Sequence, residues 1–224
     1  MSKKNFAAFA VVCCFITIAL VTVLSVRLTI SAQESCSADM FDDIVPNIFT
    51  IKEQFFTTRS RLKIYDAQDQ EIGSFTTVPS LTKTVYSFRD KQDQVVAQAT
   101  KSAFSWTYRI GRCKGATIGP AYELERIFFT FGSIEYNLRK NGVLIGNPAK
   151  KTLFTCRPDV VIESPNGTLL ATASRSCLGS LLIDTWKMTN YGDEIENYAL
   201  GFIAYITTQQ ENSADAKSSN SKKN

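Results

Sequence analysis

Residues 198–206 read YALGFIAYI, nine consecutive positions without a charged side chain. They follow the polar run NYGD at 190–193, and Asp193, Glu194 and Glu196 are the acidic residues that suit the first turn of a helix. A helix that is apolar on every side must be buried on every side, yet nine residues are too few to span a membrane. We therefore expect a helix over 194–206 that forms the core around which the remaining chain folds.

The residues before this helix have the pattern of short strands joined by polar turns. Four strand–turn–strand units share this plan: IYDAQDQEIG at 64–73, FRDKQDQVVA at 88–97, NLRKNGVLIG at 137–146 and VIESPNGTLLA at 161–171. Four more stretches are rich in β-branched and aromatic residues and predict strands: 81–88, 104–110, 126–133 and 181–189. The sequence therefore predicts an all-β fold, in which a closed antiparallel barrel surrounds the helix and leaves no free strand edge.

The carboxylates in the turns have a structural explanation. Asp and Asn tolerate the left-handed backbone of a tight turn, and their side chains bond the amides that follow. We therefore interpret Asp66, Asp69, Asp90 and Asp93 as turn formers. The alternative is a calcium site, but the EF-hand spacing and its closing Glu are missing, so we predict no metal site. Trp106, Tyr108 and Trp186 stand in predicted strands, where packing is the expected role and a ligand pocket the alternative.

Strand pairs joined by the turn pattern D-x-x-[DN]-[QG] and followed by a buried hydrophobic helix resemble the tubby C-terminal-like fold. Within that fold the chain is most similar to the LURP-one-related proteins, with the phospholipid scramblases as more distant relatives. The resemblance covers residues 48–208 and is carried by 64–73, 88–97, 161–171 and 194–206. It implies a twelve-stranded antiparallel barrel that encloses the C-terminal helix.

The resemblance also implies membrane association, because tubby domains bind phosphoinositides through basic residues and scramblases act on phospholipids. Arg59, Arg61 and Lys63 alternate along one predicted strand and so share a face. The alternative is that these are ordinary solvated cations of a strand face. The other lipid-binding candidates lie around the third hairpin: Arg139, Lys140, Lys150 and Lys151.

The amino-terminal segment predicts a membrane anchor. Residues 6–26 carry no charge and are long enough to cross a bilayer, and they lie between Lys3 and Lys4 on one side and Arg27 on the other. The alternative is a cleaved signal peptide, with a cleavage site at 30–32. The predicted organisation is a short basic amino terminus (1–5), a transmembrane signal-anchor (6–26), a juxtamembrane linker (27–47), the barrel domain (48–208) and a disordered tail (209–224).

The flanking charges favour a single-pass protein whose body is extracellular or lumenal, with a cytosolic body as the alternative. In an oxidising compartment the four cysteines outside the span could form two disulfides: Cys36, Cys113, Cys156 and Cys177. Their pairing does not follow from the sequence. Asn166 begins an N-G-T sequon at a predicted turn, which makes it a candidate glycosylation site.

Composition narrows the class of function. The chain has no histidine, so the most common general base and zinc ligand are missing. Residues 36–208 hold 19 basic and 18 acidic residues, a balance that does not suit a nucleic-acid partner. We expect no cofactor and no enzymatic activity. The predicted function is a membrane-anchored binding or interaction module whose partner is a phospholipid or a protein. The alternative is phospholipid handling, by phosphoinositide binding or scrambling.

Overall fold

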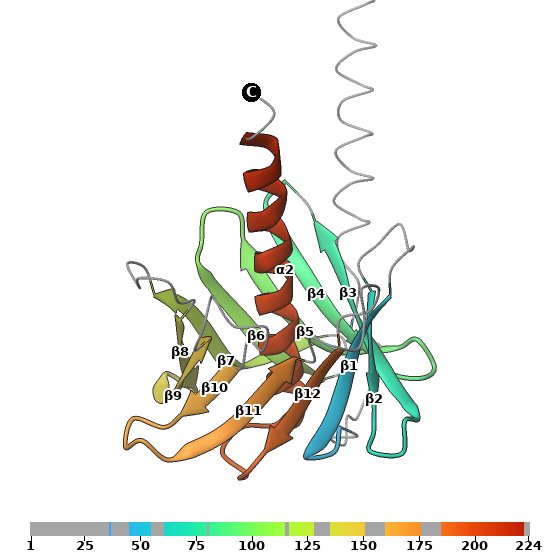
Figure 1. Cartoon of the computed structure of the whole chain (residues 1–224), viewed down its shortest axis with the longest axis vertical. Helices are drawn as coiled ribbons and strands as arrows, with labels where there is room; N and C mark the ends of the chain where they lie inside the picture. Colours follow the sequence, from blue (N-terminus) through green and yellow to red (C-terminus); the bar gives the residue numbers. More distant parts are fainter. Residues whose placement is uncertain are drawn as a thin grey trace, which may run out of the picture. The chain divides into compact units, whose positions relative to one another are not determined.

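The computed structural model describes residues 36, 45–54, 61–79, 81–114, 117–127, 135–150, 160–175 and 185–221. Twelve antiparallel strands form a closed barrel in the order β1-β12-β11-β10-β9-β8-β7-β6-β5-β4-β3-β2 (Figure 1). The strands are β1 (Ile48–Gln54), β2 (Arg61–Tyr65), β3 (Glu71–Pro79), β4 (Lys83–Arg89), β5 (Val95–Ser102), β6 (Thr107–Lys114), β7 (Thr117–Ile127), β8 (Glu135–Lys140), β9 (Val143–Lys150), β10 (Val160–Glu163), β11 (Leu169–Arg175) and β12 (Thr185–Asn190). The prediction of an all-β closed barrel is confirmed.

One helix, α2 (Asn197–Ser221), runs through the barrel and leaves it at one end (Figure 1). Every residue from 197 to 208 is buried, as expected for a segment that is apolar on all sides. Phe75 of β3 makes an edge contact with Phe202, with ring centroids 4.8 Å apart, and stacks on Tyr205 at 5.3 Å. Side chains of α2 and of the described strands therefore pack against one another inside the barrel.

The inner face of the barrel follows from alternation along the strands. Pairs two residues apart point inward and are buried, such as Leu62 and Ile64 on β2 or Leu124 and Tyr122 on β7. Small residues occur where space is short, because an added Cβ on Gly201 of α2 would lie 2.7 Å from the ring of Phe75. Burial of these apolar faces against the helix is the main force that holds the fold together.

The predicted turns form as expected. The Asp66 carboxylate accepts hydrogen bonds from the amides of Gln68 and Gln70 at 2.9 and 2.8 Å. Asp90 accepts the equivalent bonds from Gln92 and Gln94 at 2.9 and 2.8 Å. The residues with positive φ in the hairpin turns are Asp69, Asp93, Asn141, Gly142 and Gly167. All four predicted hairpin units are confirmed as β2–β3, β4–β5, β8–β9 and β10–β11.

Several predicted boundaries are wrong. The helix begins at Asn197 rather than 194, because Glu196 precedes it and accepts the first helical bond, from the amide of Leu200 to its carbonyl at 3.3 Å. The helix also continues through 209–221, where composition predicts a disordered tail. Leu81 and Phe104 lie outside β4 and β6. The predicted strand 126–133 matches only the last two residues of β7, and 128–134 lie outside the described residues.

Cys36 forms a disulfide with Cys113 of β6 across a sequence separation of 77. Together with Val95 the two cysteines make a small buried cluster apart from the main core. The prediction of disulfide bonding is thus confirmed for one pair. Cys156, Cys177 and the predicted anchor at 6–26 lie outside the described residues, and no helix among the described residues has the length and apolarity to span a bilayer.

Candidate functional site

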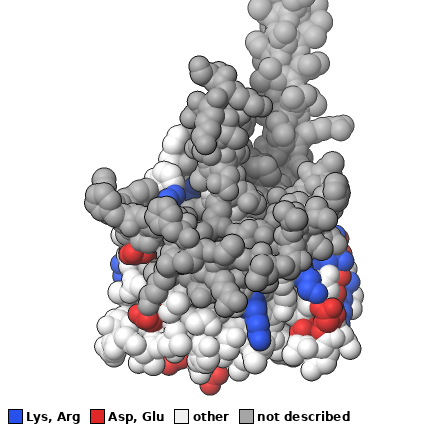
Figure 2. Space-filling view, viewed as in Figure 1, with Lys and Arg blue, Asp and Glu red and all other residues white. Residues whose placement is uncertain are grey.

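The cations predicted on β2 share one outward face but are engaged in ion pairs. Arg61 lies 3.4 Å from the carboxylate of Asp93, and Lys63 lies 2.6 Å from that of Glu71. Lys52, opposite Lys63 on β1, completes the series with Asp69 at 2.5 Å. Each cation of this face therefore has a carboxylate beside it. Figure 2 shows Lys, Arg, Asp and Glu interspersed on the described part of one face.

The second predicted group of cations does not join the first. Arg139 and Lys140 lie on β8, which is half-way round the closed strand order from β2. Lys140 lies over the ring of Tyr122 at 5.3 Å and donates to the carbonyl of Glu194 at 3.3 Å. It therefore helps to hold the start of α2. Arg59, Lys151 and the side chain of Lys150 lie outside the described residues.

The other predicted site residues are placed as follows. Asn166 is exposed in the turn between β10 and β11. The carboxylates of Asp66 and Asp90 are used by the turns, and among the described residues no group of three Cys, Asp or Glu is arranged to hold a metal ion. Tyr108 and Trp186 are packed in the core, whereas Trp106 is 49% exposed, so the packing prediction is wrong for Trp106.

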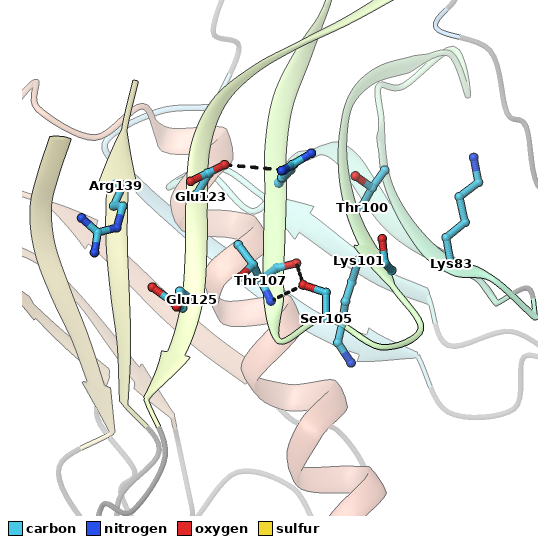
Figure 3. A pocket seen from close by; sticks show the side chains of 10 residues that line it. Lys83, Thr100, Lys101, Ser105, Thr107, Glu123, Glu125 and Arg139 are labelled. Carbon is cyan, nitrogen blue, oxygen red and sulfur yellow. Dashed lines mark hydrogen bonds and ion pairs between the residues drawn. The ribbon is translucent and has the colours of Figure 1, made fainter. Parts of the chain in front are cut away.

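A polar pocket of about 440 Å³ lies on the barrel wall across β4 to β8 (Figure 3). Four cations and two carboxylates line it, together with four hydroxyl side chains, and Arg109 on β6 faces Glu123 on β7 at 3.5 Å. Its lining residues are Lys83, Thr100, Lys101, Ser102, Ser105, Thr107, Arg109, Glu123, Glu125 and Arg139. The pocket is thus polar and carries a net charge of +2 from its ionised side chains.

The alternation of side chains along β6 and β7 places their polar residues in the pocket. Register pairs Thr107 with Glu125 and Arg109 with Glu123, while the intervening Tyr108 and Leu124 point inward and are buried. At the adjoining turn, the Ser105 hydroxyl accepts a hydrogen bond from the Thr107 amide at 3.0 Å. The polar groups are therefore held on rigid strands, which favours a binding surface that is formed before any ligand arrives.

Lys101 has the most distinctive electrostatic environment in the pocket. Burial lowers its pKa, and the charge of Arg126 lowers it further. Its ammonium lies 4.9 Å from the ring centroid of Trp106 and 5.7 Å from that of Tyr108. Arg126 also lies over Trp106, at 5.8 Å. Two like charges are thus held near one indole ring, an arrangement that an anionic group on a ligand would stabilise.

Exposed apolar side chains stand beside this pocket. Leu81 is 89% exposed and Phe104 is 100% exposed. They lie at the turns that follow β3 and β5, and the turns are tied together by a hydrogen bond from the Ala103 amide to the Thr82 carbonyl at 2.9 Å. We call Leu81, Phe104 and Trp106, with Lys83, Lys101 and Arg126, the tip surface.

Among the described residues, the tyrosines at the barrel–helix boundary have the most strongly raised pKa values. Burial raises the pKa of Tyr86, Tyr122, Tyr136 and Tyr198 well above the ordinary value. They therefore stay protonated at neutral pH and pack in the core, where the Tyr122 hydroxyl also bonds Glu196. Tyr205 is used in the same way, since its hydroxyl bonds that of Thr77 at 2.5 Å.

Sequence reasoning missed most of the pocket and all of the tip surface except Trp106. Of the pocket residues only Arg139 was among the predicted site residues, because the others come together only through the register of five strands. The signal for the tip surface was the position of Leu81 and Phe104 beside turn residues. We assigned both Leu81 and Phe104 to strands. No family model, curated protein or solved structure matches the chain. The relationship to the tubby-like and LURP-one-related proteins therefore stays a prediction.

Proposed function

We propose that the protein is a membrane-anchored, non-enzymatic binding module that recognises a protein partner on the outer wall of its barrel. The observation that carries the proposal is the pocket across β4 to β8, which gathers Lys83, Lys101, Arg109 and Arg139 against two carboxylates on a rigid sheet. Because α2 fills the barrel, a partner has to use the outer surface. The excess of cations favours an acidic segment of the partner.

A non-enzymatic role is supported by the chemistry of the chain. There is no histidine in the sequence, and the described groups with the most strongly raised pKa values are tyrosines packed around α2. Such groups neither donate nor accept protons readily near neutral pH. The pocket offers hydroxyls and paired charges, which suit hydrogen bonding and charge recognition better than acid–base chemistry.

Phospholipid handling is the second candidate. The ion pairs of β1 and β2 argue against a lipid-binding site formed by the cations of these strands. Lys52, Arg61 and Lys63 each lie beside a carboxylate, so recognition of an anionic headgroup there would first have to break those pairs. If the body lies outside the cell or in a lumen, phosphoinositides of the cytosolic leaflet would also be out of reach.

Site-specific photo-crosslinking of the full chain in cells tests the proposal. A photoreactive residue at Thr107 lines the pocket, and one at Ser174, an exposed position on β11, provides the matched control. We expect a discrete crosslinked protein from position 107 that weakens with Arg109→Glu and is absent from position 174. Equal crosslinking from both positions, or none from 107, would contradict a partner site in the pocket.

A further inference from the structure

We propose that the tip surface inserts into the interfacial region of the bilayer in which the protein is anchored. This inference rests on the proposed membrane anchoring and needs no partner in the pocket, although Lys83 and Lys101 belong to both the pocket and the tip surface. It concerns penetration by apolar side chains and does not require recognition of a particular headgroup.

The exposure of the apolar residues is the first observation. The exposure of all of Phe104 and nearly all of Leu81 to water is unfavourable. Two turns that are bonded to each other and present one such side chain each mark a contact surface. The register fixes their proximity: Lys83 pairs with Ser102, and the next bond outward joins Ala103 to Thr82. Leu81 precedes Thr82 and Phe104 follows Ala103, so each is the next residue along the chain from this bond.

The charges around these residues have the order that a bilayer interface requires. Lys83 lies two residues after Leu81, at the start of β4, and Lys101 lies three residues before Phe104, near the end of β5. Apolar tips would enter the acyl boundary while the ammonium groups stay at the level of the lipid phosphates. A protein partner would have to provide an apolar pocket for each of two separate tips, whereas a bilayer accommodates both without a matched shape.

Trp106 completes the arrangement. It is half exposed, lies between the turn and the barrel, and carries Lys101 and Arg126 over its ring. Its carbonyl accepts a hydrogen bond from the Arg126 amide at 3.2 Å, which fixes the turn to β7. An amphipathic indole next to cations is the side-chain type enriched at membrane–water interfaces. The Trp106 indole therefore lies where its emission would report how deeply the tip surface inserts.

The two tryptophans of the chain make the test direct. Trp186 is 1% exposed in the core, so Trp186→Phe leaves Trp106 as the one emitter and Trp106→Phe leaves the buried control. Full-length protein is reconstituted into phosphatidylcholine vesicles, floated on a density gradient, and compared in vesicles with and without brominated acyl chains. A second series contains phosphatidylserine, which separates apolar insertion from charge attraction.

We expect Trp106 to lose emission in brominated vesicles and the Trp186 control to be unaffected. Leu81→Asp and Phe104→Asp, both at exposed positions, should remove this loss while the protein still floats and Trp186 keeps its core emission. Protein that floats but shows Trp106 quenched by aqueous iodide and not by bromolipid would overturn the inference and leave the anchor intact; it would also point to a protein occupant of the tip surface. Protein that does not float would overturn both, because neither the anchor nor the tip surface would then hold lipid.

Discussion

The hydroxyl of Tyr122 on β7 bonds both the side chain and the backbone of Glu196. The Tyr122 hydroxyl donates to the Glu196 carboxylate at 3.1 Å and accepts from the Glu196 amide at 3.0 Å. Arg112 of β6 also donates to that carboxylate and lies over the ring of Tyr198 at 5.2 Å. Tyr122 thus bonds polar groups of Glu196, the residue before α2, and thereby fixes the place where the helix enters the barrel.

Tyr122→Phe should lower the free energy of unfolding by about 1–3 kcal/mol, because the Glu196 amide and carboxylate both lose a partner in a partly buried site. Urea unfolding of the variant measures the effect. Tyr191→Phe is the matched control: Tyr191 is 57% exposed and its hydroxyl lies 3.3 Å from that of Thr172. Equal losses in the two variants would show that the link between Tyr122 and Glu196 adds nothing specific.

Gly201→Ala should destabilise the protein although alanine is the better helix former. The new methyl group would lie 2.7 Å from the Phe75 ring, and overpacking of this kind costs about 1–3 kcal/mol against a gain of about 1 kcal/mol in helix propensity. Phe75→Leu should recover part of the loss when combined with Gly201→Ala, so the double variant is more stable than the sum of the single effects predicts. A stabilising Gly201→Ala would mean that α2 is not enclosed by the barrel.

Loss of the disulfide should destabilise the fold. Without a disulfide that links residues 77 apart, the unfolded chain has a higher conformational entropy. This should lower the free energy of unfolding by about 4 kcal/mol. Cys36→Ser, Cys113→Ser and the double variant should have the same melting temperature, because each removes the same bond. A double variant clearly less stable than either single variant would show that the two cysteines act separately.

Alkaline pH should destabilise the protein through its buried tyrosines. Burial raises the pKa of Tyr198 and Tyr136 above the ordinary 10.0, so above that pH the unfolded chain loses protons that the folded chain keeps. The stabilisation is therefore complete below pH 10 and declines as the pH rises further. Urea unfolding across this range, with Tyr136→Phe for comparison, measures the slope, which should be smaller in the variant. An unchanged slope would show that Tyr136 does not contribute.

The sequence predicts the barrel, its turns and its central helix because each depends on local rules. Asp66 and Asp90 bond the amides two and four residues ahead, and the residues 198–206 have no polar face to expose. The pocket depends on register instead: Arg109 meets Glu123 only because Tyr108 pairs with Leu124. The helix beyond 208 also escapes prediction, since its composition there contains few apolar residues.

The most direct test of the account is the topology and membrane attachment of the full-length protein in eukaryotic cells. Asn166 is exposed in a turn, so glycosylation there reports the side of the membrane on which the barrel lies. We predict that the protein resists alkaline carbonate extraction and shows a glycosidase-sensitive mobility shift that Asn166→Gln abolishes. Release by carbonate, together with no shift in the wild-type protein, would contradict a membrane-anchored module with an extracellular or lumenal barrel.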